Sequence, residues 1–156
     1  MIFSGTRPDN LGVKDGKLAA CPNSPNCVSS QSPSADETHF IQPLKYTSAS
    51  EKAFSDLKKV IESEDRTKII NESQDYWYTE FKSALMGYVD DVEFYLDSSS
   101  NTIHVRSASR LGQSDLGVNR KRIETIRSKF NQMQGSWSYF LKLEDRIYRI
   151  SNTSPH

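Results

Sequence analysis

Two cysteines lie close together in a proline-rich stretch of this 156-residue chain. Cys21 and Cys27 are separated by five residues, two of which are prolines. A turn in such a segment can bring two α-carbons to the roughly 4.4–6.8 Å that a disulfide requires. The pattern therefore fits three uses of the thiols: structural bridging or burial, redox regulation, or a metal or catalytic site.

The histidines do not favour the metal-binding use. A structural zinc site usually takes four ligands, and the three histidines of the chain, His39, His104 and His156, do not lie at motif spacing. A catalytic thiol needs a nearby cation or helix start that lowers its pKa, which spacing alone does not reveal. We predict no metal and no cofactor, a structural role for the cysteines, and redox regulation as the alternative.

A second group of polar residues lies between a predicted strand end and a predicted helix start. The N-terminus of a helix offers free amides and a positive dipole end to anions, and guanidinium groups strengthen such binding. A structural explanation is favoured over this one, because the same residue types cap helices and form ion pairs. The candidate anion-binding residues are Arg106, Arg110, Ser114, Asp115, Asn119, Arg120 and Arg122.

Two amphipathic helices are predicted around these residues. In the first, Ser48 and Glu51 match a capping box, and apolar residues then recur at helical spacing to about Glu64. The second helix is predicted at about residues 118–133, again with an apolar stripe. Both helices are expected to cover one face of a sheet.

The residues between the helices alternate between apolar and polar side chains, as strands do. Consecutive strands without intervening helices favour an antiparallel sheet with one covered face. We therefore predict an α+β fold, a two-layer sandwich of an antiparallel sheet packed by two helices, with a long irregular N-terminal leader. The expected strands are Thr67–Ser73, Tyr76–Lys82, Asp90–Leu96 and Ile103–Ser109, the last two forming a hairpin.

The chain is expected to have three parts: an extended leader with the cysteine pair at 1–45, the α+β core at 46–134, and a C-terminal extension at 135–156. Within the extension, residues 137–151 alternate as in a hairpin, with a short helix as the alternative. The leader is rich in proline and glycine, which indicates turns rather than regular structure. Its expected apolar anchors on the core are Phe3, Leu11, Val13, Leu18, Phe40, Ile41 and Leu44.

Three stretches of the chain resemble a known family. They are residues 3–13, residues 21–31 around the cysteines, and residues 105–122 from Val105-Arg106-Ser107 through Asn119-Arg120-Lys121-Arg122. Their order and spacing are similar to the bacterial and plastid domain-of-unknown-function family 1499, over about residues 3–133. The resemblance implies no activity. It implies relatives in photosynthetic lineages that often carry an upstream membrane helix or targeting segment.

No such segment precedes the first motif in this sequence, and no apolar run is long enough to span a bilayer. A cytoplasmic location is therefore expected, and a plastid, thylakoid or periplasmic compartment is the alternative if a targeting segment has been removed. Twenty basic and twenty acidic residues balance, so no nucleic-acid partner is predicted. A basic stripe on the second helix allows peripheral membrane contact.

These observations favour a soluble binding or accessory module with a protein partner, assisting a larger membrane or photosynthetic complex. No residues form a recognisable catalytic constellation, so an enzyme is the less favoured class. Two alternatives remain open. One is a small-anion-binding protein or enzyme that uses the loop between Arg110 and Arg122, and the other is a thiol-based redox-regulated protein that uses Cys21 and Cys27.

Overall fold

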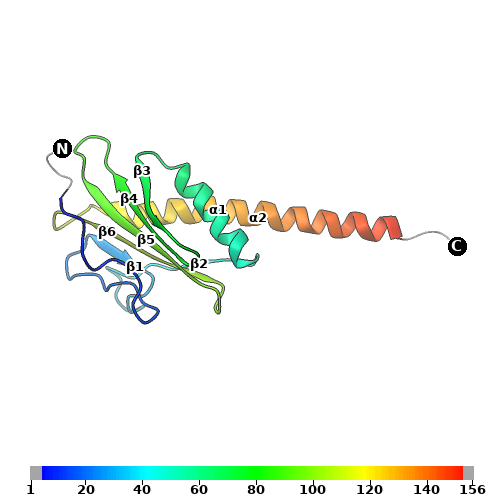
Figure 1. Ribbon diagram of the computed structural model, residues 1–156, viewed down its shortest axis with the longest axis horizontal. Coiled ribbons are helices and arrows are strands. Elements are labelled where there is room, and N and C mark those ends of the chain that lie inside the picture. Colours follow the sequence, from blue (N-terminus) through cyan, green and yellow to red (C-terminus); the bar gives the residue numbers. More distant parts are fainter. Residues whose placement is uncertain (1–4, 153–156) are drawn as a thin grey trace.

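The fold is a two-layer α+β sandwich in which two helices cover one face of a six-stranded antiparallel sheet (Figure 1). The computed structural model describes residues 5–152, except for the side chains of residues 136–141 and 152. The elements are β1 (Cys27–Ser29), β2 (Leu44–Lys45), α1 (Ser50–Glu62), β3 (Thr67–Glu72), β4 (Tyr76–Lys82), β5 (Val89–Asp97), β6 (Thr102–Ser109) and α2 (Val118–Asn152).

The sheet has the strand order β1-β6-β5-β4-β3. The four strands predicted from alternation pair in sequence, and the turn after Asp97 joins β5 to β6 as expected. Two short leader strands, β1 and β2, share the other edge of β6. The leader therefore belongs to the sheet, because its backbone hydrogen bonds are made with β6.

The apolar core lies between the sheet and the two helices. Alternate residues of β4, β5 and β6 point into it, and they meet the apolar stripes of α1 and α2. The Phe54 ring stacks on the Trp77 ring with centroids 3.8 Å apart. The largest apolar side chains that are fully buried here are Phe94, Phe130, Ile41, Leu44, Leu57, Ile61, Ile103, Ile123 and Ile126.

The second face of the sheet is also covered, which differs from the prediction of one covered face. The leader crosses this face, and Leu18 is buried there while Ile41 and Leu44 reach the core. The other expected anchors, Leu11, Val13 and Phe40, are partly buried, and Phe3 lies outside the described residues. Alternation along a strand does not show this cover, because the covered side chains are charged rather than apolar.

The capping-box prediction at Ser48 is wrong. The helix α1 begins at Ser50 with Ala49 as its cap residue, and no side chain caps its first turn. The Ser48 hydroxyl donates instead to the Ala49 carbonyl. Because the cap residue is Ala49 rather than Ser48, Glu51 is the second helical residue and not the third, which the reciprocal bond of a capping box requires.

The predicted hairpin over residues 137–151 is also wrong, because these residues continue α2. Helix α2 contains 35 residues, and its second half extends away from the body (Figure 1). Leu143, Ile147 and Ile150 recur at helical spacing, and the residues around them have good helix propensity. The aromatic alternation at residues 137–141, which suggested a strand, concerns side chains outside those described.

Candidate functional site

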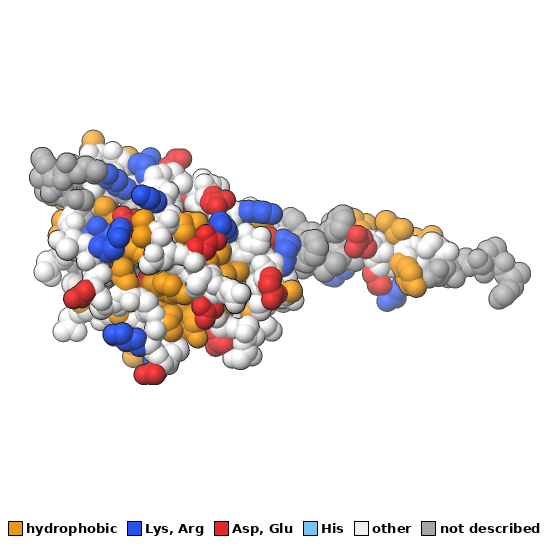
Figure 2. Space-filling model, in the orientation of Figure 1, with side chains coloured by type: hydrophobic (Ala, Val, Ile, Leu, Met, Phe, Trp, Pro, Cys, Tyr) orange, Lys and Arg blue, Asp and Glu red, His pale blue; other side chains and the backbone are white. Residues whose placement is uncertain are grey.

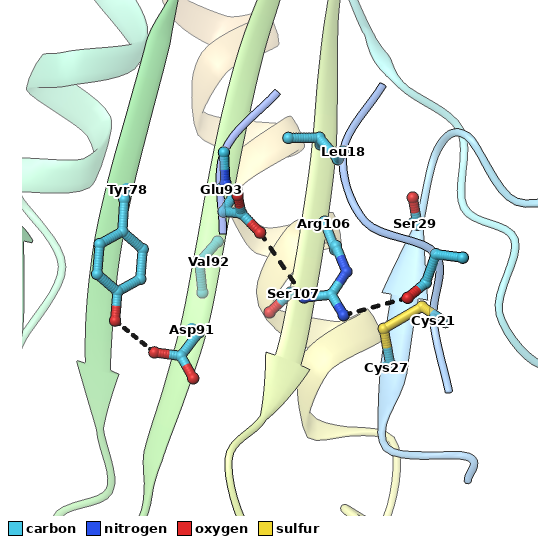
Figure 3. A network of polar contacts seen from close by, with 12 residues as sticks. Leu18, Cys21, Cys27, Ser29, Tyr78, Asp91, Val92, Glu93, Arg106 and Ser107 are labelled. Atoms are coloured by element: carbon cyan, nitrogen blue, oxygen red, sulfur yellow. Dashed lines mark hydrogen bonds and ion pairs between the residues drawn. A yellow bond between two sulfur atoms is a disulfide. The ribbon is translucent and has the colours of Figure 1, made fainter. Parts of the chain in front are cut away.

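The predicted polar residues fall on both sides of the sheet. Strand β6 points Arg106 toward the leader and Ser107 toward α2, and Figure 3 shows the two side chains on opposite faces. Arg110, which follows the strand, lies on the leader side, whereas Arg122 comes from α2. The structure therefore does not bring all of the predicted anion-binding arginines together, because the sheet lies between them.

The face under the leader, called here the covered face, carries a buried glutamate and a buried arginine. Glu93 on β5 is fully buried, and Arg106 on β6 is 5% exposed. Glu93 Oε1 lies 3.7 Å from Arg106 Nη1 (Figure 3). Glu93 Oε2 accepts hydrogen bonds from the Gly12 amide at 2.8 Å and the Tyr76 hydroxyl at 2.6 Å. Burial raises the pKa of Glu93 and lowers the pKa of Arg106.

A second ion pair on the covered face joins Asp91 to Arg110. Arg110 donates to both carboxylate oxygens of Asp91, at 2.6 and 3.2 Å. The hydroxyl of Tyr78 also donates to Asp91 (Figure 3). This two-pronged contact raises the pKa of Arg110 and accounts for both charges being buried. At the edge of the same group, Arg7 of the leader pairs with Glu80.

The predicted cysteines form a disulfide beside this network. The Cys21 and Cys27 sulfurs are 2.06 Å apart and the α-carbons 5.7 Å apart. Cys27 lies on β1 and Cys21 in the leader, so the bridge ties the leader to the edge of the sheet (Figure 3). The Arg106 guanidinium donates to the carbonyl of Ala20, the residue before Cys21.

The remaining predicted residues lie on the α2 side of the sheet. Arg122 pairs with Asp90 at 2.6 Å and donates to Asn119 at 2.9 Å. Asn119 is fully buried, and its amide group donates to the carboxylate of Asp115 at 2.8 Å. Asp115 also accepts from the Asn119 backbone amide at 3.0 Å, so it caps the first turn of α2.

Two predicted residues make simpler contacts. Arg120 donates to the leader carbonyls of Glu37 and Thr38, each at 3.2 Å. The Ser114 hydroxyl accepts a long hydrogen bond from the Leu116 amide. Each predicted arginine is therefore engaged by protein groups, and anion binding by these residues stays a prediction.

The cysteine loop and the start of α2 meet through Asn26, which sequence reasoning missed. The Asn26 side chain donates to the Gly112 carbonyl at 2.8 Å. Its backbone carbonyl accepts from the Ser109 amide at 2.9 Å and from the Asn119 side chain at 3.2 Å. An asparagine beside Cys27 carries no distinctive sequence signal, because short polar residues are common in turns.

An open groove lies at this end of the sheet, with a volume of about 710 Å³. It is lined by the β4–β5 loop, the loop between β6 and α2, the first turns of α2 and the segment before β3. Of the predicted residues, Ser114, Asp115 and Arg122 line it. The groove thus contains part of the predicted site, together with apolar residues that were not predicted to take part in it.

Apolar side chains surround the groove and remain exposed. Leu85 in the β4–β5 loop is 91% exposed, and Leu116 in the loop before α2 is 94% exposed. Figure 2 shows Lys and Arg side chains near apolar ones on the body at the end where the β4–β5 loop lies. The other exposed apolar residues of these loops and of the start of α2 are Met86, Tyr88, Leu111 and Val118.

Leu116 has an unusual backbone conformation. Its φ is 55°, in the left-handed region, and Gly117 follows with φ of 81°. The Val118 amide donates to the Asp115 carbonyl at 3.1 Å, which closes a tight turn. Glycine, asparagine and aspartate are the usual residues where a turn needs positive φ. A leucine there is strained, and its exposed side chain gains little apolar burial to offset the strain.

Among the described residues, no group of three or more His, Cys, Asp or Glu side chains is arranged to hold a metal ion. Within the same part of the chain, no helix is both long and apolar enough to cross a membrane.

A family model described as "Protein of unknown function (DUF1499)" matches residues 17–130. The match confirms the family resemblance and includes both cysteines and every candidate anion-binding residue. Comparison with curated proteins gives no significant match, and comparison with solved structures gives none either.

Proposed function

Because the chain belongs to the DUF1499 family, whose description assigns no activity, we propose a function from the groove: the protein is a non-covalent binding module. The observation that carries this proposal is the exposure of apolar side chains around a groove of about 710 Å³. Apolar side chains gathered around a concavity are typical of binding sites. In the cell, such a binding module would serve the accessory role that is predicted from the sequence.

The charges around the groove favour a partner group that is amphipathic and anionic. Two lining carboxylates are already paired, Glu64 with Lys129 at 2.7 Å and Asp90 with Arg122 at 2.6 Å. Lys121 on the first turn of α2 is exposed, and its ammonium group makes no hydrogen bond or ion pair with the described residues. An anionic head near Lys121, with an apolar body against the groove, satisfies both kinds of side chain.

Binding of the dye anilinonaphthalene sulfonate, an anionic aromatic amphiphile, tests this proposal. The folded protein is expected to bind the dye saturably with a rise in fluorescence. Val118→Ser and Lys121→Glu are each expected to weaken binding several-fold, because one removes apolar contact and the other reverses a charge. Both positions are exposed, so the variants should fold.

The matched control is Ile147→Ser on the far part of α2, where Ile147 is 64% exposed. This change removes a similar apolar surface away from the groove and should leave dye binding unchanged. Equal dye binding by the groove variants and the unmodified protein, or loss of binding in the control alone, would contradict the proposal.

We propose redox regulation through Cys21 and Cys27 as a second function. The supporting observation is the position of the bridge, which ties the leader to β1 beside the buried Arg106. Two electrons and two protons from a cellular dithiol would reduce the disulfide to two thiols and loosen this cover. Disulfides persist in oxidising compartments, so the bridge supports the plastid, thylakoid or periplasmic alternative over the cytoplasmic one.

Measuring the intact mass of the protein with and without reductant tests this second proposal. A gain of two hydrogens per chain is expected on reduction, with faster amide exchange in the leader around Leu18. If a cellular dithiol such as reduced thioredoxin leaves the bridge intact while the protein stays folded, regulation by reduction is excluded.

A further inference from the structure

The two most exposed leucines of the body stand on two different loops at the same end of the molecule. Leu85 belongs to the β4–β5 loop and Leu116 to the loop before α2, and both loops line the groove. Leu85 does not itself line the groove. A ligand held only inside the groove would therefore leave Leu85 in water, whereas a broad apolar surface would reach both leucines.

The strained turn indicates that the position of Leu116 matters for more than folding. Asp115 and Gly117 are ordinary residues for such a turn, and the Asp115 side chain accepts from the Gly117 amide at 2.9 Å. Leu116 between them adds backbone strain and loses apolar burial at once. Strain of this kind is concentrated at sites that bind or react, and the turn holds the leucine outward.

Cationic side chains line the groove that the two loops form. Arg66, Lys82 and Lys121 line the groove. Of the four carboxylates that line it, Glu64 and Asp90 form ion pairs and Asp115 caps α2. Asp65 is the fourth carboxylate. Apolar side chains at loop tips with cations behind them match the interface of a membrane that contains anionic lipids.

We propose that this end of the protein docks on the surface of a membrane that contains anionic lipids. Leu85 and Leu116 enter the interfacial region, and Lys121 with Arg66 faces the lipid headgroups. A bilayer is favoured over a protein surface because a fluid apolar medium accepts two separate, fully exposed leucines without a matching pocket for each. This inference rests on the proposed function, since it names the partner of the same groove.

Co-sedimentation with lipid vesicles tests the proposal. The full chain is expected to bind vesicles of equal parts phosphatidylcholine and phosphatidylglycerol, and to bind pure phosphatidylcholine vesicles several-fold more weakly. Leu85→Ser and Leu116→Gly should each lower binding by about tenfold, the order expected when a leucine leaves an apolar environment. Lys121→Glu should lower binding to the anionic vesicles alone.

Ile147→Ser on α2 is the control for general apolar adhesion, and it should bind vesicles like the unmodified protein. No binding to anionic vesicles, binding unaffected by both leucine changes, or loss of binding in the control would overturn the proposal. Dye binding separates the two proposals, because Leu85 lies outside the groove lining. If the dye binds and the vesicles do not, membrane docking fails while the groove proposal stands; if neither binds, both fail.

Discussion

The covered face and the groove belong to the same sheet, but charged side chains are buried on the first and apolar side chains are exposed around the second. On the covered face, Asp91, Glu93 and Arg106 are almost fully buried. Asp91 pairs with Arg110, and Glu93 pairs with Arg106. Around the groove, Leu85 and Leu116 are almost fully exposed.

This difference suggests separate roles for the two regions, stability for the buried charges and binding for the exposed leucines. Buried charges are tolerated where partners within the chain satisfy them, and they make removal of either partner costly. The exposed leucines bury little apolar surface within the fold, and the proposed function assigns their contacts to another molecule. The predictions below test whether stability depends on the first region and binding on the second.

The largest effect is expected from Arg110→Ala. The change leaves the Asp91 carboxylate buried without its ion-pair partner, which typically lowers the free energy of unfolding by about 3–5 kcal/mol. Urea denaturation followed by tryptophan fluorescence measures the loss. The matched control is Lys129→Ala, which breaks an exposed pair with Glu64 and should cost less than about 1 kcal/mol. Equal losses in the two variants would remove the distinction between the covered face and the surface.

Removal of the disulfide should have the next largest effect. The double change Cys21→Ser and Cys27→Ser frees a short loop and is expected to lower the free energy of unfolding by about 2–3 kcal/mol. The loss should appear as faster amide exchange in the leader, with dye binding in the groove retained. If the double variant lost dye binding while amide exchange in the leader stayed slow, the bridge would support the groove rather than the covered face.

A smaller, pH-dependent effect is expected from His39 in the leader. Hydrogen bonding to the Ser24 carbonyl and to Asp36 raises the pKa of His39. A raised pKa means that the stabilisation is complete below the unfolded pKa, near about 6.5, and is lost as the pH rises through the folded pKa. Burial lowers the pKa of His104, so that residue contributes in the opposite sense.

Comparing the unmodified protein with His39→Gln isolates the contribution of His39. Unfolding free energies at acidic and at slightly alkaline pH should differ between the two proteins, with the loss in the variant greater at acidic pH. A loss that is the same at both pH values would show that protonation of His39 does not support the leader.

The smallest effect on stability should come from Leu116→Gly. Glycine relieves left-handed strain of about 1 kcal/mol, and this gain is offset by about 0.5–1 kcal/mol from the greater freedom of glycine in the unfolded chain. The melting temperature should therefore stay the same or rise slightly while vesicle binding falls. A clear drop in melting temperature would mean that Leu116 supports the fold and is not a binding residue.

Much of the fold could be predicted from the sequence because its core obeys simple periodicity. Strand β4 has the predicted bounds, and α1 and the other three predicted strands agree with the prediction to within about two residues at each end. Periodicity failed where aromatic residues at every second position suggested strand pairing although the backbone continued as α2. It also could not show that Glu93 and Arg106 lie under the leader, since alternation places charged residues on a face without revealing what covers it.

The candidate site was predicted less completely. The short spacing of Cys21 and Cys27 allowed a bridge, which the structure shows, but left redox, metal and catalytic uses open. The groove depends on loops that meet only after the sheet and α2 are assembled, so Leu85 and Leu116 carried no sequence signal in common. The left-handed turn was the closest clue, because Gly117 indicates a turn, but a leucine before it indicates nothing by itself.

The length of α2 has a consequence for whatever the groove holds. The helix begins beside the groove with Val118 and runs 35 residues to the far end of the molecule, which at about 1.5 Å per residue is a rod of about 50 Å. Apolar side chains lie along its outer part (Figure 2). A partner bound to these outer residues would lie at a fixed distance from any surface bound at the groove end of α2. The chain would then act as a molecular spacer.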